Sequence, residues 1–199
     1  MYLKEEEKTE SKLKKKQSPA MKKFLDSRQI IISGEVSEEL AEKTVNKLLM
    51  MEVLSATKPI YVYIDSPGGN VYSGFAIFDA IRFIKPPVKT IGMGLVASAA
   101  SIILLAAKKE NRFAFPNSQY LIHQPLSEMK GVATDLEIHA KEIERIRERV
   151  NLLIANETGQ NKDKIIQDTE RDYWLNAEEA IAYGLVSKII SSRKELPTK

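Results

Sequence analysis

Only two histidines occur among the 199 residues, so any chemistry that depends on an imidazole must use His123 or His139. His123 ends an apolar run and is followed by Gln124-Pro125, where the chain must leave a sheet. The carboxyl ends of parallel strands are where α/β folds place their sites, which makes His123 a candidate. His139 lies among charged residues of a helical stretch, and we expect it to be a solvated surface residue.

Two other segments place small residues directly after an apolar run. Ser98 follows VKTIGMGLVA and opens an apolar helix, so its hydroxyl would lie beside backbone N–H groups that can hold an oxyanion. Gly68 and Gly69 follow YVYIDSP, and glycines let a backbone approach a ligand closely. Taken alone, Ser98 is typical of a helix N-cap, the glycine pair is typical of a turn, and His123 is as often structural as catalytic.

Together these features favour acyl transfer by a Ser–His pair, with the serine as nucleophile and the histidine as general base. The chain has no cysteine, which excludes a cysteine nucleophile, thiolate metal sites and a disulfide scaffold. A reducing compartment, the cytoplasm, is therefore the expected location. The pair needs an orienting acid, and composition does not choose one among the 27 acidic residues.

The length and charge distribution predict one folded domain with a tail. A chain of 199 residues, 43% of them hydrophobic, can bury a real core. Residues 1–23 hold eight Lys, four Glu and few apolar side chains, and we interpret them as a solvated tail, with a propeptide or a loop that orders on assembly as alternatives. Residues 24–199, the predicted domain, carry 22 basic and 23 acidic residues, a balance that argues against nucleic-acid binding. The apolar run 92–107 is shorter than the ~20 residues that span a bilayer, so we predict a buried helix and no membrane segment.

Strand and helix patterns alternate along the domain, which predicts an α/β fold with a mainly parallel sheet. Ser37 is the predicted N-cap of the first helix, whose apolar stripe is Leu40, Ala41, Thr44, Val45, Leu48 and Leu49. The expected strands are 28–34 (buried), 60–64, 88–95, 112–115, 119–123 and 185–190, and the expected helices include 71–84, 99–109, 132–157 and 177–183.

The longest predicted helix, 132–157, carries one apolar seam. Its members recur at heptad spacing: Leu136, Ile143 and Val150, interleaved with Ala140, Ile146 and Leu153. Such a helix either packs on its own domain or projects and mates with another subunit.

Four strings, YIDSPGGNVYSGFAIFDAI, GLVASAASIILLAA, PNSQYLIHQP and DTERDYWLNAEEAIAYGLV, are similar in order and spacing to those of the ClpP family of self-compartmentalising serine proteases. The resemblance runs from about Asp26 to Ile190. It implies the ClpP/crotonase-type α/β spiral of strand–helix units with a projecting handle helix. It also implies two stacked heptameric rings, either homo-oligomeric or mixed with a second ClpP-type subunit.

By position, Ser98 matches the family nucleophile, His123 its general base and Asp172 the acid that orients the histidine. The backbone N–H groups of Gly69 and Ala99 match the oxyanion hole. A substrate peptide would lie as an added strand near Gly68, Val71 and Leu126. The resemblance implies no metal and no cofactor, and unfolded proteins as substrates.

The resemblance also implies docking of an AAA+ unfoldase of the ClpX, ClpA or ClpC type in aromatic-lined clefts between subunits. Tyr61, Tyr63, Phe83 and Phe113 match those cleft positions. Without the resemblance, two strand tyrosines and two phenylalanines are equally typical of an ordinary core.

Several departures from the family pattern indicate a divergent paralogue. Asp65 replaces the usual Asn, Ser127-Glu128 replaces Gly-Gly after LIHQPL, and Val132 replaces a Gln that often pairs across the ring interface. Two alternatives to an active peptidase therefore stay open. One is a weakly active structural or regulatory subunit that modulates a second ClpP-type ring, and the other is a crotonase-like acyl-CoA enzyme on the same fold.

Overall fold

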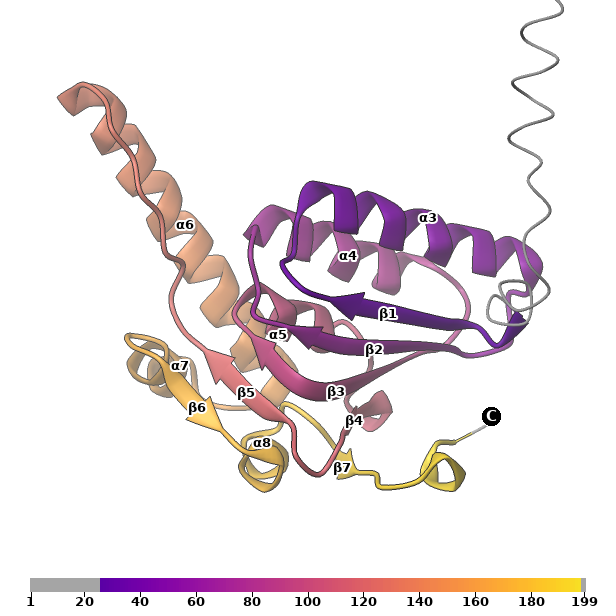
Figure 1. Cartoon of the computed structure of the whole chain (residues 1–199). Helices are drawn as coiled ribbons and strands as arrows, with labels where there is room; N and C mark the ends of the chain where they lie inside the picture. Colours follow the sequence, from indigo (N-terminus) through magenta and orange to yellow (C-terminus); the bar gives the residue numbers. More distant parts are fainter. Residues whose placement is uncertain (1–25, 198–199) are drawn as a thin grey trace, which may run out of the picture.

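Within residues 26–197, which the computed structural model describes, a seven-stranded sheet has the order β1-β2-β3-β4-β7, with β5 pairing β3 and β6 pairing β5 (Figure 1). Every strand pair is parallel except β5 with β6. The sheet therefore matches the mainly parallel arrangement expected from the sequence. The strands are β1 (Gln29–Ser33), β2 (Ile60–Ser66), β3 (Val88–Ala97), β4 (Arg112–Ala114), β5 (Gln119–Ile122), β6 (Tyr173–Leu175) and β7 (Lys188–Ile189).

Strand β3 changes partner halfway along its length. Its residues 90–92 pair with β4 and its residues 95–97 pair with β5. Between these halves the register against β2 slips, from Ile64 opposite Gly92 to Ser66 opposite Val96. The Asp65 carboxylate accepts a 3.0 Å hydrogen bond from the Leu95 N–H inside this bulge. Extra residues in one strand bend it, and the bulge bends β3 in this way. The sheet therefore continues from β3 in two directions, through β4 and β7 on one side and through β5 and β6 on the other.

The two faces of the sheet carry different side chains. Along β2, Ile60, Val62 and Ile64 are fully buried in the large core beneath the helices. Tyr61 and Tyr63 point to the opposite face. There they pack on a smaller cluster of Ile91, Phe113, Ile190 and Leu196.

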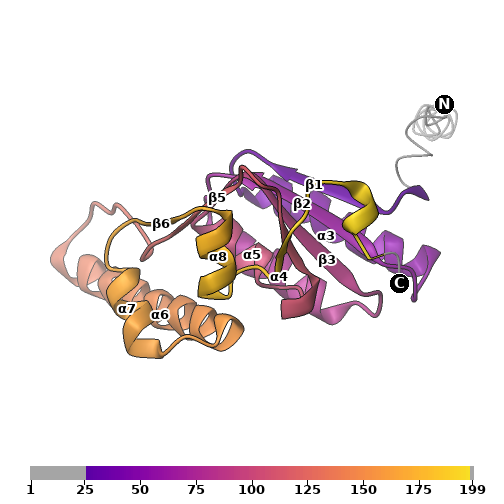
Figure 2. The same cartoon turned by 90° about the horizontal axis from the view of Figure 1, so that it is seen from below.

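Helices α3 and α4 lie together above β1 and β2, while α6 projects away from the sheet (Figure 1), and α7 and α8 lie near the base of α6 (Figure 2). Ser37 caps α3 by accepting from the Leu40 N–H, which confirms the predicted cap. The helices are α3 (Glu38–Leu54), α4 (Val71–Phe83), α5 (Ala99–Leu104), α6 (Ala133–Thr158), α7 (Lys162–Asp168) and α8 (Ala177–Tyr183), with 3-10 turns η1 (Lys109–Asn111) and η2 (Arg193–Glu195).

Two predicted boundaries are wrong. The helix expected over 99–109 ends at Leu104, because side chains of Arg82 and Arg112 take the carbonyls that would continue it. The strand expected over 185–190 shrinks to β7, because the Leu185 N–H still bonds to the Ala180 carbonyl at the end of α8.

Two predicted burial patterns also need correction. β1 is buried on one face only, and Ile31 on its other face is about half exposed. On α3 the buried residues are Ala41, Thr44, Leu48 and Met51, so the stripe rotates away from Leu49 toward the sheet.

The seam predicted on the long helix is divided between two environments. In its C-terminal half Val150 is buried in the core, and Ile146 and Leu153 are partly buried against it. In its projecting half Leu136 remains exposed, as does Ile138, which lies outside the predicted seam. We call the projecting half, residues 133–145, the handle.

The base of α6 is tied to the domain by the almost fully buried guanidinium of Arg112. Its Nε donates to the Ala107 carbonyl at 2.7 Å, Nη1 to the Glu157 carbonyl at 2.8 Å, and Nη2 to the Leu105 carbonyl and the Glu157 carboxylate. Glu157 also accepts from Arg82 of α4 at 2.6 Å. The Glu157 carboxylate and the guanidinium groups of Arg82 and Arg112 thus join α4, α6 and the end of α5.

No helix within residues 26–197 is long and apolar enough to cross a membrane. The tail predicted over 1–23 lies outside the described residues.

We predict that Arg112→Ala destabilises the domain by about 3–5 kcal/mol, because it removes the buried guanidinium partner of Glu157 and leaves the buried Ala107 carbonyl without its side-chain donor. Chemical denaturation followed by circular dichroism measures this cost. Lys43→Ala, which removes an exposed ion pair with Glu39 on α3, is the matched control and should leave the unfolding midpoint unchanged. Equal midpoints for both variants would contradict the structural role of Arg112.

Candidate active site

Ser98 lies at the junction of β3 and α5 in an unusual backbone conformation. Its φ of 54° and ψ of −122° are rare for a residue with a side chain and cost roughly 1–3 kcal/mol. Its N–H donates to the Leu121 carbonyl of β5 at 2.9 Å, and its carbonyl accepts from Ser101. Ser98 occupies the N-cap position of α5, but its side chain makes no capping hydrogen bond. The simple N-cap interpretation therefore does not account for this serine.

His123 and Asp172 are brought together by the antiparallel pairing of β5 and β6. Ile122 pairs with Tyr173, so the residues just beyond this pair face each other. His123 Nδ1 lies 3.0 Å from Asp172 Oδ1. The imidazole is largely buried, with 14% of its side chain exposed, whereas the carboxylate is 60% exposed. Geometry thus singles out the acid that composition could not choose.

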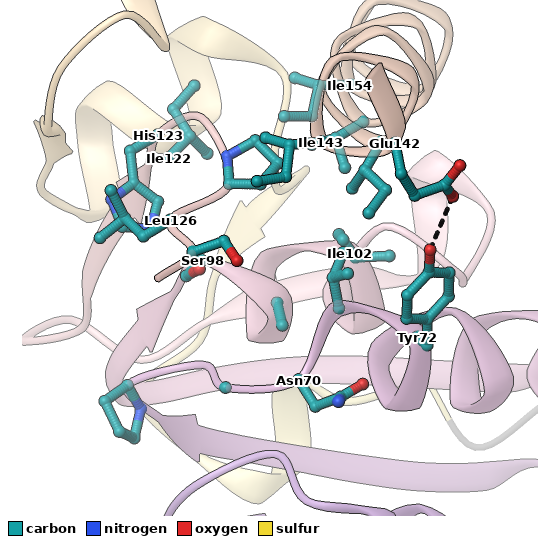
Figure 3. Close-up of a pocket in the computed structure, with 18 of the residues that line it drawn as sticks. Asn70, Tyr72, Ser98, Ile102, Ile122, His123, Leu126, Glu142, Ile143 and Ile154 are labelled. Carbon is teal, nitrogen blue, oxygen red and sulfur yellow. Dashed lines mark hydrogen bonds between the residues drawn. The ribbon is translucent and has the colours of Figure 1, made fainter. Parts of the chain in front are cut away.

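Ser98 and His123 line one cavity of about 560 Å³, and their side chains lie close together at one end of it (Figure 3). No hydrogen bond joins the two within the described residues. Catalytic hydrogen bonds are often long in a free enzyme and tighten when substrate binds.

The glycine turn after β2 is held against the segment after β1. Val36 donates its N–H to the Gly68 carbonyl and accepts from the Asn70 N–H, both at 2.8 Å. In such a parallel bridge the N–H of the middle residue, Gly69, points away from Val36. A Cβ on Gly68 would lie 2.6 Å from Ser98 Cβ and 3.0 Å from the Ala99 nitrogen. The turn therefore lies directly against Ser98 and the first N–H of α5.

The rest of the cavity is mostly apolar. It extends between α5 and α6, and Tyr72 and Glu142 close its far end (Figure 3). The aliphatic side chains in its lining are Ile102, Ile122, Ile143, Ile146, Val150 and Ile154.

The predicted substrate-binding residues surround this cavity. Val71 and Leu126 line it, and Leu126 is strongly exposed. Gly68 lies behind Ser98 rather than in the lining.

The expectation for His139 is wrong. It is partly buried, lines the same cavity, and its Nε2 lies 2.7 Å from Ser127 Oγ. This contact ties the loop after β5 to the handle. The signal for it was the Ser127-Glu128 departure, which puts a hydroxyl where the family usually has glycine. Sequence reasoning also missed Tyr72 and Glu142, because no spacing rule connects residues on two separate helices.

The four predicted docking residues do not form one surface in a single chain. Tyr61, Tyr63 and Phe113 share the smaller cluster, in which Phe113 is only 3% exposed. Phe83 is 79% exposed and ends α4 on the helical side of the sheet. Asp65, which replaces the usual Asn, directs its carboxylate at the bulge in β3.

Residues 26–197 contain no cluster of three or more His, Cys, Asp or Glu side chains that could hold a metal ion.

Comparison with known proteins identifies the family. A family model described as Clp protease matches residues 12–193. The chain belongs to the Clp protease family. The match begins 14 residues upstream of the predicted start at Asp26 and so includes part of the charged N-terminal segment.

Relatives within the family support a ClpP paralogue. The chain is 67% identical over 179 residues to ATP-dependent Clp protease proteolytic subunit 2 of Treponema denticola, with 90% of each chain covered. It is 49% identical over 176 residues to the subunit of the same name from Pseudomonas aeruginosa, covering 88% of this chain and 87% of that one. A mutant of ClpP1 from Listeria monocytogenes superposes with a TM-score of 0.84 at 48% identity, covering 89% of this chain and 99% of the other. These matches confirm the predicted fold and do not support the acyl-CoA alternative.

We predict that Gly68→Ala slows labelling of Ser98 by a fluorophosphonate at least about 100-fold, the effect of losing one oxyanion donor, because the new methyl group would collide with Ser98 and displace the turn. Rates of adduct formation followed by mass spectrometry test this.

Gly159→Ala is the matched control for that experiment. Gly159 also has a positive φ, +81°, but a Cβ there meets nothing within 4 Å. This variant should lose about 1 kcal/mol of stability and keep its labelling rate. Equal labelling of both variants would contradict the close contact between the turn and Ser98.

Proposed function

We propose that this chain is a serine endopeptidase subunit that hydrolyses peptide bonds of unfolded proteins to short peptides within a barrel-shaped, ATPase-partnered assembly. The observation that carries the proposal is the convergence of Ser98, His123 and Asp172 from three separated segments, with the imidazole bonded to the carboxylate. Family membership supports the peptidase class.

The geometry suits a Ser–His–Asp mechanism. Ser98 Oγ attacks the scissile carbonyl carbon while His123 Nε2 takes the hydroxyl proton, and Asp172 holds Nδ1 and stabilises the imidazolium. The carbonyl oxygen becomes an oxyanion, which the Gly69 and Ala99 N–H groups would hold. His123 then protonates the leaving amine, the C–N bond breaks, and a water molecule hydrolyses the acyl-enzyme by the same route. This chemistry requires no metal or cofactor.

The substrate would bind as an extended strand across the mouth of the cavity. One side of this path is the segment from Gly69 to Tyr72, and the other is the segment after Pro125, around Leu126. The aliphatic walls suit an apolar side chain on the residue whose carbonyl is attacked.

Assembly into two stacked heptameric rings, or into mixed rings with a second ClpP-type subunit, is part of the proposal. The handle supports it, because Leu136 and Ile138 stay exposed on a helix that leaves its own domain. An AAA+ unfoldase of the ClpX, ClpA or ClpC type would dock where Phe83 of one subunit meets Tyr61 and Tyr63 of the next. That pairing would unite residues that a single chain keeps on opposite sides of its sheet. A cytoplasmic location completes the proposal and is supported by the lack of cysteine.

A second candidate is a weakly active structural or regulatory subunit that modulates a partner ring. The missing Ser98–His123 hydrogen bond favours it, because a serine without its base is a poor nucleophile. Labelling of the assembled protein, alone and with a second ClpP-type subunit, separates the two candidates.

We predict that wild-type protein cleaves fluorogenic peptides and labels with a fluorophosphonate, and that Ser98→Ala abolishes both. Asp172→Asn should keep the fold and lower kcat roughly 10⁴-fold, because an amide stabilises the wrong imidazole tautomer. Thermal unfolding serves as the folding control. If the assembled wild-type protein never labels, with or without partners, the regulatory candidate replaces the peptidase.

We predict that light scattering finds heptamers or tetradecamers, and that Ile138→Glu shifts tetradecamers toward single rings by placing a charge on the exposed apolar side of the handle. Glu137→Gln, at the neighbouring position, breaks only an exposed ion pair with Lys141 and should leave the mass unchanged. A stable wild-type monomer would contradict this role of the handle.

A further inference from the structure

The far end of the Ser98 cavity is closed by one side-chain contact between two helices. Tyr72 lies in the first turn of α4, and its hydroxyl donates a 2.8 Å hydrogen bond to Glu142 Oε1 of α6 (Figure 3). The other carboxylate oxygen of Glu142 accepts from Arg145 at 2.7 Å. Glu142 is therefore held from both sides.

A second groove, of about 720 Å³, lies on the opposite side of this contact. Tyr72, Glu142 and Ile146 line both the groove and the cavity, so together they form a wall between the two. Besides these wall residues, Phe75 and Leu152, the groove is lined by charged residues, which are Lys141, Glu144, Arg145, Glu148 and Arg149.

The wall carries a polar pair, Tyr72 and Glu142, at the end of the cavity away from Ser98 and His123. The hydrogen bond to Glu142 raises the pKa of the Tyr72 hydroxyl, so the phenol remains a protonated donor at neutral pH. On the groove side Arg149 stacks on the Phe75 ring, with 3.9 Å from its guanidinium carbon to the ring centroid. Near the wall, the Tyr72–Glu142 hydrogen bond and the Arg149–Phe75 stacking thus hold α4 and α6 together between the two spaces.

We propose, resting on the peptidase function above, that Tyr72 and Glu142 determine specificity by setting the depth of the pocket for the side chain that precedes the scissile bond. Medium-sized apolar side chains fill the space between Ser98 and the wall. A longer, rigid aromatic side chain would have to displace Tyr72 from Glu142, leaving both polar groups without partners. The wall therefore limits the length of the substrate side chain that can bind, and not its polarity.

The test uses two peptidyl diphenyl phosphonates that differ only in one side chain, leucine or biphenylalanine. Ser98 Oγ attacks phosphorus, a P–O bond forms, and phenoxide leaves and takes the serine proton through His123. We expect wild-type protein to react faster with the leucine probe. Tyr72→Ala should shift the ratio of the two rates by at least about tenfold toward biphenylalanine, because it joins the cavity to the groove.

Matched variants distinguish the effect of losing the Tyr72–Glu142 hydrogen bond from the effect of any substitution on α6. Glu142→Ala removes the acceptor and should shift the ratio in the same direction, whereas Glu142→Gln keeps an acceptor for the Tyr72 hydroxyl and should shift it less. Glu144→Ala, on the same helix and only in the groove lining, should leave the ratio unchanged. If Tyr72→Ala fails to assemble, the rate ratio of Glu142→Ala alone tests whether the wall sets the depth of the pocket.

The outcomes distinguish this inference from the function on which it rests. Wild-type protein that reacts with neither probe overturns the peptidase function and the inference together. Wild-type protein that reacts while Tyr72→Ala and Glu142→Ala keep its ratio overturns the inference alone. A loss of both rates in equal proportion also overturns it, because that is the effect of a purely structural contact.

Discussion

The bulge in β3 is the constraint on which the site depends. A regular β3 would keep one neighbour on its outer edge along its whole length, and β5 could not take over from β4. The Asp65 carboxylate satisfies the Leu95 N–H that the slip in register frees, and Gly94 leaves room for it, since a Cβ there would lie 2.5 Å from Asp65 Oδ1. With β5 beside the end of β3, Ser98 can donate to Leu121 and lie near His123. Asp65, which departs from the family pattern, thus helps to fix the position of Ser98.

The two sides of the catalytic centre are held by different means. Backbone hydrogen bonds fix the Ser98 side, since both Ser98 and the Gly68-Gly69 turn are pinned by main-chain groups of neighbouring strands. Side chains hold the His123 side, through the half-exposed Asp172 and the loop that Ser127 ties to His139. Side-chain contacts at the surface break more easily than strand pairing, so adjustments between resting and working geometry should fall on the histidine side.

The sequence predicted what local patterns control. Ser98 and His123 stand out because each directly follows an apolar strand, and Ser37 marks the start of α3 by its capping chemistry. The position of Asp172 beside His123 depends on the antiparallel pairing of β5 with β6. The two residues are 49 positions apart in the sequence, and no periodicity reveals their contact, so only the family resemblance pointed to Asp172. The end of α5 was missed for a similar reason, because Arg82 and Arg112 reach it from other elements. The seam on α6 was visible, but the sequence could not tell which half of it the domain would bury.

Chemistry and selectivity come from separate parts of this fold. Ser98, His123, Asp172 and the glycine turn all lie at strand ends, where the bulge and the strand pairing fix them together. The pocket wall comes instead from α4 and α6, whose separation is set by the Arg82–Glu157–Arg112 cluster at one end and by Tyr72 and Glu142 at the other. Within residues 26–197 the hydrogen bonds of Tyr72 and Glu142 do not involve the His123–Asp172 pair. Under the proposed function, substitutions in the wall would therefore change selectivity at little cost to the geometry of that pair.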